Sequence, residues 1–553
     1  MDWHLSCILI YGKNGNMKRF LFTLVFLGLV VIGGILLLKR VAPSTRSLGV
    51  GVGSSVHLRV GSERLPGTLD LISGMDASWI REEFPWNEIQ QFPNEFRWTI
   101  GNGLVTHDFD ALVQEAHDRN LSILAVLDGG PVFLAHVYPG MPVDKEELLH
   151  AWQGYVQAAV DRYGDQIMAW EIGNLENTQA GWGKVMFPTA SDPLASPDPD
   201  LFSQMLKAAY KIIKAKNSSA QVILGGLAMN VSDCSEAPIA FLASVQKADG
   251  WSYFDSIGVQ LTGINAWPEQ ASISGIETDP ISGVCQSGVQ VWESVMEKIQ
   301  SISTFTRQFG EKTIWVTSVG FQSFVIQDLA SYDSYTASLV ESDLLVRTVV
   351  PILSDPSIKN IFWYNLVEDP SNPSYGMGPF GQITLANINA FIKGSKPLGI
   401  IKQPGIPDDI SVYAFDKDGK TIFVAWRAVS GMDAEWLTLS GLQGSSALAY
   451  PADAAEISEA TAQSLAVSAE GDIGQEVSRR PLFIVAQAND LAGRIQSTAQ
   501  DQVEQVKESV DAGAKSLWEG AKTSLSNQIS SWLNNIKDSI LQSIQGKLDQ
   551  VFK

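Results

Sequence analysis

The chain has 553 residues and a formal net charge of -21, with 45% hydrophobic and 18% charged residues. Its length exceeds that of one ordinary hydrophobic core, so one large domain with smaller additions is expected. The acidic balance argues against nucleic acid or anionic lipid as the main partner, because phosphate binding needs a basic surface. The six histidines have no metal-ligand spacing and the three cysteines include no Cys-x-x-Cys pair. No metal or other cofactor is therefore expected.

The first predicted element is a membrane anchor. Residues 20–38 are apolar and lie between two basic pairs, and a helix of this length crosses the hydrocarbon core of a bilayer. A cleaved signal peptide, the alternative, has a shorter apolar stretch and a small-residue cleavage site. We expect an N-terminal extension (1–16), a single transmembrane anchor (17–40) and a linker (41–47). Charge alone does not orient the anchor, and on functional grounds the main body is placed outside the cytoplasm or at the cell surface.

Strand-like apolar runs alternate with amphipathic helical segments between residues 48 and 400. The eight runs are residues 48–52, 77–84, 121–128, 166–174, 221–227, 254–261, 313–320 and 359–366. Helical spacing of apolar residues is found at 107–119, 145–163, 201–216, 289–308 and 333–353. This alternation predicts an α/β fold, a (β/α)8 TIM barrel over 48–400. A doubly wound open sheet is the alternative, but it seldom has eight such units.

The pattern changes after the barrel. Short alternating runs at 411–415, 421–426 and 481–485, with a turn signal at 416–419, predict a small β-sandwich over 401–490. Residues 491–553 have apolar side chains at helical spacing and mixed charges on the other face, which predicts an amphipathic helical tail. Self-association into a homo-oligomer, or packing on the body, is the preferred role of this tail. Attachment to a membrane surface is the alternative.

Four strand ends carry motifs that resemble one enzyme clan. The second strand contains WIREEFPW (79–86), the fourth WEIGNLEN (170–177), the seventh IWVTSVGF (314–321) and the eighth IFWYNL (361–366). Together they resemble glycoside hydrolase clan A over about residues 48–487. In that clan the fourth strand carries WEIWNEP, whose Asn-Glu pair supplies the acid/base, and the seventh carries a T-E-x-G run whose Glu is the nucleophile. The resemblance therefore places Leu175 and Ser318 at the two catalytic positions.

Both substitutions remove the standard chemistry. Retaining cleavage needs two carboxyl groups about 5 Å apart, whereas leucine transfers no proton and a serine without a base is a poor nucleophile. Glu176 is the best surviving acid, and a loop carboxylate facing solvent is the alternative interpretation of it. A second carboxylate would come from Asp128, Glu368 or Asp369. The sixth strand departs further, because it ends Gln260-Leu261-Thr262 where related enzymes often have a His or an aromatic residue.

The remaining strand-end residues suit a carbohydrate. Aromatic faces stack on sugar rings, and polar side chains bond to their hydroxyl groups. We expect the substrate-binding residues to be Arg81, Trp86, Asp128, Asn174, Gln260, Trp363 and Tyr364, with Trp182 and Trp267 as further aromatic candidates.

A disulfide is predicted between Cys234 and Cys285. Both cysteines fall in loops after consecutive barrel strands, where a bridge can form in an oxidising compartment. Two unrelated free thiols are the alternative.

Three functions are consistent with this pattern. The first is a membrane-anchored, non-catalytic pseudoenzyme that binds carbohydrate or acts as a scaffold. The second is an active glycoside hydrolase with a relocated carboxylate pair that includes Glu176. The third is an oligomeric structural protein of the cell envelope, in which the acidic barrel is a spacer and the C-terminal helices assemble copies.

Overall fold

The computed structural model describes most of the chain from residue 49 to residue 488. The described ranges are 49–53, 55–101, 105–135, 140–191, 193–229, 237–261, 263–269, 277–278, 285–286, 294–331, 334–367, 376–428 and 433–488. The predicted anchor, the C-terminal tail and Cys234 lie outside these ranges, so the anchor, the tail helices and the Cys234–Cys285 bridge stay predictions. Within the described ranges, no helix is both long and apolar enough to cross a membrane.

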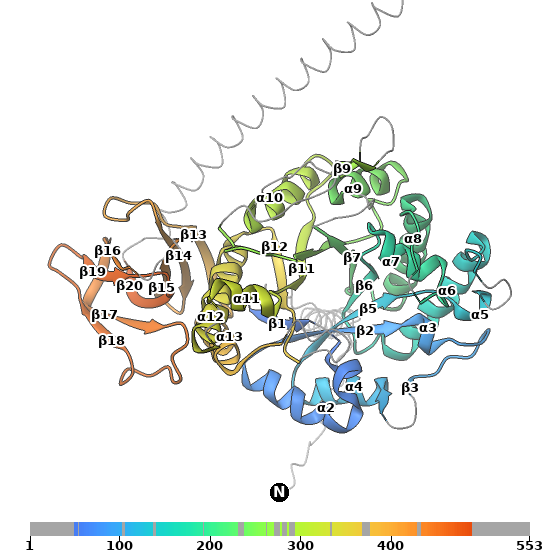
Figure 1. Cartoon of the computed structure of the whole chain (residues 1–553), viewed down its shortest axis with the longest axis horizontal. Helices are drawn as coiled ribbons and strands as arrows, with labels where there is room; N and C mark the ends of the chain where they lie inside the picture. The colour runs from blue at the N-terminus through green and yellow to red at the C-terminus, as the bar shows by residue number, and fades with distance from the viewer. Residues whose placement is uncertain are drawn as a thin grey trace, which may run out of the picture. The chain divides into compact units, whose positions relative to one another are not determined.

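Eight parallel strands close into a barrel, as the sequence predicts (Figure 1). In order around the barrel they are β1 (Val50–Gly53), β12 (Ile358–Trp363), β11 (Thr313–Val319), β8 (Ser256–Leu261), β7 (Gln221–Ala228), β6 (Ala169–Asn174), β5 (Ser122–Asp128) and β2 (Trp79–Pro85). The eight predicted runs correspond to these strands one to one. The open-sheet alternative is therefore wrong.

Helices surround the barrel strands (Figure 1). The longer ones are α2 (Val56–Gly74), α4 (Phe109–Asp118), α6 (Lys145–Tyr163), α8 (Pro199–Lys216), α9 (Pro238–Lys247), α10 (Val295–Thr306), α12 (Ser334–Ser354) and α13 (Pro379–Ile392). The shorter ones are α3 (Trp86–Ile89), α5 (Val132–Ala135), α7 (Gln179–Met186) and α11 (Ser323–Leu329). Two short hairpins in the loops are β3 (Thr99–Gly101) with β4 (Thr106–Asp108), and β9 (Glu277–Thr278) with β10 (Cys285–Gln286).

The interior of the barrel is apolar toward the amino ends of the strands and polar toward their carboxyl ends. Leu124, Ala169, Ile223, Trp315 and Phe362 form a buried cluster against which Trp79 packs. The next inward-facing residues on β2 and β6 are charged, because side chains alternate between the two faces of a strand. Polar groups are therefore concentrated toward the carboxyl ends of the strands, where barrels of this type have their functional sites.

On the outer face of β2, a buried carboxyl group binds the first turn of α2. Glu82 is fully buried, and its Oε2 accepts a hydrogen bond from the backbone N–H of His57 at 3.2 Å. This satisfies a donor that an isolated helix leaves unpaired. The His57 ring is also buried and contacts the rings of His107 and Phe109 edge-on, with centroids 5.4 and 5.1 Å apart.

The free energy of unfolding is expected to fall as the pH rises from 7 to 8. Burial raises the pKa of Glu82 from 4.5 to about 8. The folded chain therefore keeps a proton that the unfolded chain has lost, and each pH unit in this window removes up to about 1.4 kcal/mol. His57 acts in the opposite direction only below pH 6.5, because burial and then His107 lower its pKa to about 3.

Urea unfolding of a Glu82→Gln variant checks this prediction. The amide has no proton to lose in this range, so the variant should have a flatter stability profile between pH 7 and 8 than the wild type. A variant with an unchanged slope would show that Glu82 is not the titrating group.

A six-stranded antiparallel sheet and a two-stranded layer form a smaller domain after the barrel. The sheet order is β13 (Lys396–Ile400), β14 (Ile410–Lys417), β15 (Lys420–Arg427), β20 (Leu482–Ala488), β17 (Leu442–Pro451) and β18 (Gln463–Ala466). The strands β16 (Glu435–Leu439) and β19 (Ile473–Val477) pair with each other, and their inward side chains share a core with one face of the sheet. The extra β domain is thus confirmed, and its first strand, β13, begins before the predicted boundary at residue 401.

The other face of the six-stranded sheet packs on the barrel helices. Phe391 of α13 stacks on Phe483 with ring centroids 4.6 Å apart and contacts Tyr450 at 5.3 Å. Asn387 of the same helix donates from Nδ2 to the carbonyl oxygens of Ala452 and Ala454, both at 2.9 Å. The two domains therefore share one hydrophobic cluster.

A glutamate in the loop after β8, Glu269, bonds to both α12 and the sheet. Arg347 of α12 donates from Nε and Nη2 to the two carboxylate oxygens of Glu269, each at 2.8 Å. Trp426 of β15 donates its indole N–H to Oε1 of Glu269 at 2.6 Å. The Arg347 guanidinium also lies 4.1 Å from the centre of the Trp267 ring. Arg347 thus binds a loop at the carboxyl end of the barrel, here called the barrel mouth. The sheet contacts the same loop through Trp426.

Candidate functional site

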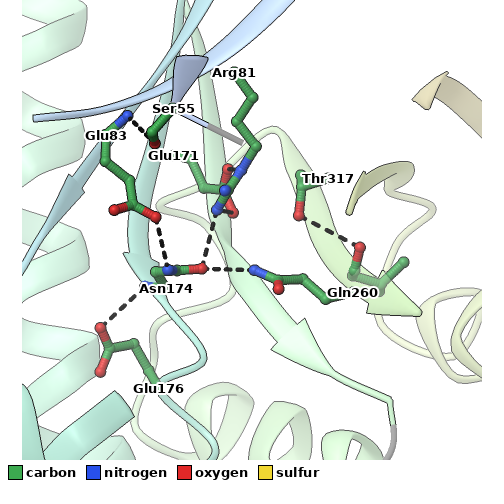
Figure 2. A network of polar contacts seen from close by, with 9 residues as sticks. Ser55, Arg81, Glu83, Glu171, Asn174, Glu176, Gln260 and Thr317 are labelled. Atoms are coloured by element: carbon green, nitrogen blue, oxygen red, sulfur yellow. Dashed lines mark hydrogen bonds and ion pairs between the residues drawn. The ribbon is translucent and has the colours of Figure 1, made fainter. Parts of the chain in front are cut away.

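A connected set of buried polar side chains lies inside the barrel (Figure 2). Arg81 of β2 donates to the Glu171 oxygens at 2.7 and 3.0 Å, and to Oδ1 of Asn174 at 3.0 Å. Gln260 of β8 donates from Nε2 to the same Asn174 oxygen at 2.6 Å, and Asn174 donates from Nδ2 to Glu83 at 3.3 Å. Arg81 is 4% exposed and Glu171 is fully buried. The predicted residues Arg81, Asn174 and Gln260 are therefore brought together.

Gly226 on β7 makes room for this network. A Cβ atom at residue 226 would lie 2.3 Å from Nε2 of Gln260 and 2.7 Å from Oε1 of Glu171. Both distances are shorter than any contact that a side chain tolerates, so the glycine is required by a close approach rather than by a turn.

A Gly226→Ala variant is expected to displace Gln260 and lower the free energy of unfolding by about 1–3 kcal/mol, the usual effect of overpacking a buried site. Gly67→Ala on α2 is the matched control, because a Cβ there has no atom within 4 Å, and it should be neutral or slightly stabilising. Chemical denaturation measures both. Equal stability of the two variants would contradict the close packing of Gly226.

Glu176 is buried at 2% exposure, so its interpretation as a solvent-facing loop carboxylate is wrong. The backbone turns at Leu175, which has a φ of +67°, and the Glu176 side chain folds back so that Oε1 accepts a hydrogen bond from Asn174 N at 3.1 Å. Gly173 makes this fold-back possible, because a Cβ there would lie 2.5 Å from Cγ of Glu176. Gly173 stands where the clan motif has tryptophan. This difference was visible in the sequence and is the signal that could have predicted the burial.

Glu176 and Asp128 form a pair of buried carboxyl groups at the ends of β6 and β5. Burial and then the negative charge of Asp128 raise the pKa of Glu176 well above its ordinary value. Burial likewise raises the pKa of Asp128 to about 6, and the charge of Glu83 adds to this, whereas the Lys184 cation opposes it. Among the described residues, no N–H group hydrogen-bonds to Glu176 Oε2 or Asp128 Oδ1, and a hydrogen bond between the two carboxyl groups adds to the raised pKa of Glu176. Sequence reasoning identified Asp128 and Glu176 but missed Glu83 and Lys184.

The facing strands β8, β11 and β12 present a different chemistry. Ser318 of β11 is 3% exposed, and within the described ranges no histidine or carboxylate hydrogen-bonds to it. Trp363 is 3% exposed at the end of β12. Tyr364 follows it, is half-buried, and its hydroxyl accepts a hydrogen bond from Arg59 Nη2 at 3.1 Å. The candidate acids Glu368 and Asp369 lie outside the described residues.

All four tryptophans predicted as sugar platforms are buried, including Trp363, which is 3% exposed. Trp86 is fully buried and stacks on Tyr155, with an interplanar angle of 13°, because α3 begins at this residue and turns the ring toward α6. Trp182 is 1% exposed and Trp267 is 4% exposed, the latter beneath the Arg347 guanidinium. A sugar ring cannot stack on any of the four while they are buried in this way. Tyr364 is the most accessible of the predicted aromatic residues.

The architecture is a glycoside hydrolase-like fold. A closed barrel of eight parallel strands carries the buried Arg81–Glu171–Asn174 network at its carboxyl end, and a β domain packs beside it. Two amides and several carboxyl groups at this end can accept and donate hydrogen bonds to the hydroxyls of a sugar.

Similar solved structures include glycoside hydrolases of two families. A family 39 glycoside hydrolase from the gut symbiont Bacteroides cellulosilyticus WH2 matches with a TM-score of 0.57 and 16% identity, over 80% of this chain and 81% of that chain. A GH30 endoxylanase from Clostridium papyrosolvens C71 matches with a TM-score of 0.47 and 14% identity, over 80% of this chain and 97% of that chain. No protein-family model and no curated protein matches the chain. The similarity to the family 39 structure, at 16% identity, establishes the fold alone.

Proposed function

We propose that this chain is a glycan-binding protein that holds its ligand at the barrel mouth without cleaving it. The observation that supports this best is the one-sided placement of the acidic groups. Glu83, Asp128 and Glu176 belong to β2, β5 and the turn after β6, which are neighbours, whereas Ser318 is on β11, four places around the barrel from β5. Glycosidic cleavage needs carboxyl groups that flank the scissile bond, and Ser318 carries none.

The remaining polar groups support binding. Asn174 and Gln260 are 8% and 7% exposed, and they are oriented by hydrogen bonds within the network rather than free to rotate. Oriented polar groups lose little conformational entropy when a ligand binds. We extend the proposal to location: residues 17–40 anchor the chain in a membrane and the barrel faces outward, where glycans are found.

A glycan array and equilibrium binding to the recognised oligosaccharide test this function. Gln260→Ala should weaken binding at least about ten-fold, or about 1.4 kcal/mol, because it removes a mouth amide and frees Asn174. The matched control is Gln157→Ala on α6, an exposed residue that bonds only to Asp161 on the same helix, and it should bind as the wild type does. Equal binding by both variants, or no glycan binding by the wild type, would overturn the proposal.

The Glu176–Asp128 pair favours a second candidate, glycoside hydrolysis with relocated carboxyl groups. A carboxyl group whose pKa is raised keeps its proton at neutral pH, which a general acid must do. Turnover of aryl glycosides that disappears in both Glu176→Gln and Asp128→Asn would establish this activity and remove the non-catalytic proposal. If neither turnover nor glycan binding is found, the third function remains, and it predicts a lower oligomeric mass when residues 491–553 are deleted.

A further inference from the structure

The two-stranded layer of the β domain has one apolar and one mixed face. Along β16 and β19 the side chains alternate, and Leu437, Leu439, Ile473 and Val477 point into the core shared with the six-stranded sheet. The outward residues are Trp436 and Thr438 on β16 and Gly474 and Glu476 on β19. This alternation assigns Trp436 to the solvent face by register.

Trp436 is exposed in a fixed position. It is 58% exposed, and every other tryptophan in the described part of the chain is buried or partly buried. Its ring occupies the space beside Gly474 on the neighbouring strand, because a Cβ at residue 474 would lie 2.3 Å from Cζ2 of Trp436 and 2.8 Å from Cε2. Because Gly474 has no side chain, one side of the indole lies against the backbone of β19 and the rest is open to solvent. Among the described residues, Trp436 belongs to none of the hydrophobic clusters.

The surroundings of Trp436 indicate what it contacts. Glu476 is directly opposite it in the strand register and is exposed, whereas alternation places Glu435 on the other face of β16. A protein interface needs a contiguous apolar patch, which this acidic neighbour interrupts. An aromatic ring beside a hydrogen-bond acceptor is instead the arrangement that holds a sugar, since the ring covers the C–H face and the carboxylate accepts from hydroxyls. The same charge, on a chain of net charge -21, disfavours uronic or sulfated sugars.

We propose that Trp436, seated on Gly474 and paired across the strands with Glu476, is a second glycan-binding site, which takes uncharged pyranose rings of a polysaccharide. It is separate from the barrel mouth and supplies what the mouth lacks, an open indole surface. Two sites on one chain raise the retention on a polymer well above that of either site alone.

Depletion assays with the full chain and a panel of insoluble neutral polysaccharides (cellulose, xylan, mannan, chitin and β-1,3-glucan) test the site. Trp436→Ala should weaken retention about ten-fold, and Trp436→Phe should retain most of it. Gly474→Ala keeps the tryptophan but displaces its ring, and should weaken retention about three-fold. Phe309→Ala is the matched control, because Phe309 is 38% exposed and lies between α10 and β11, at the opposite end of the barrel from the mouth, and it should have no effect.

A direct readout uses mild oxidation of tryptophan followed by peptide mass spectrometry. A soluble oligosaccharide of the retained polymer should protect Trp436 from oxidation in the wild type and in Gln260→Ala, whose mouth is altered. If Gln260→Ala binds the oligosaccharide more weakly than the wild type while Trp436 stays protected, both sites are supported. If Trp436→Ala is retained like Phe309→Ala, or if no neutral polysaccharide retains the wild type, the second site is excluded, whatever the mouth binds.

Discussion

Replacing Glu171 with leucine should lower the free energy of unfolding by about 3–5 kcal/mol, the effect seen when one partner of a buried ion pair is removed. The guanidinium of Arg81 would remain 4% exposed with two of its three donated hydrogen bonds lost. Only the Asn174 amide would still accept from it. Urea denaturation measures the change directly.

Two companion variants show that the effect comes from the unpaired charge. Glu171→Gln keeps the shape and one acceptor, so it should be less destabilising than leucine. The double variant Arg81→Met with Glu171→Leu removes both charges, and it should recover part of the loss because two apolar groups can replace a buried pair. The single variants Arg81→Met and Glu171→Leu are measured beside it. If the free energy of unfolding lost by the double variant equals the sum of the losses in these two, Arg81 and Glu171 are not coupled.

Removing Arg347 should have the second largest effect, a loss of about 3 kcal/mol in an Arg347→Met variant. Arg347 is 1% exposed and provides both hydrogen bonds to Glu269 from α12. It also lies near Asp343, a carboxyl group that has no exposed surface and whose pKa burial raises to about 7 against the effect of three arginines. Without Arg347, the β domain should unfold in its own transition at a lower temperature than the barrel.

Calorimetry distinguishes this from a general loss of stability. Arg97→Met is the control, because Arg97 pairs with Glu95 at the surface, where both side chains are about half exposed, and such pairs contribute less than about 1 kcal/mol. A single shifted transition in Arg347→Met would mean that Arg347 stabilises the barrel alone and does not couple it to the β domain.

The barrel strands were predictable because parallel strands are buried on both faces and give continuous apolar runs. The run in β5, residues 122–128, is an example, since only its first residue is exposed. Helix α2 was missed because its pattern is interrupted at Gly61, whose φ of +73° places a kink inside the helix. A period of 3.6 residues cannot be recognised across such a break.

The candidate site was less predictable than the fold. Strand positions correctly placed Arg81, Asn174 and Gln260 in one region because alternation along a strand decides which side chains point inward. The burial of Glu176 depends instead on the left-handed backbone of Leu175. Leucine gives no sequence signal for that conformation, so the glycine at residue 173 is the signal that the sequence offers for this burial. Trp86 was predicted to line the barrel mouth, but it is buried. The local reason is similar, because α3 follows β2 without an intervening loop.

The order of the six-stranded sheet leaves two free edges, and both resist pairing with another chain. β13 contains Pro397, which has no N–H to donate, and its register shifts between Pro397 and Gly399. β18 at the other edge has only four residues. Short, irregular or proline-bearing edges are how natural sheets avoid adding foreign strands. Copies of this sheet should therefore not join edge to edge into a continuous sheet, and crowding the chain on a surface should not by itself start cross-β aggregation.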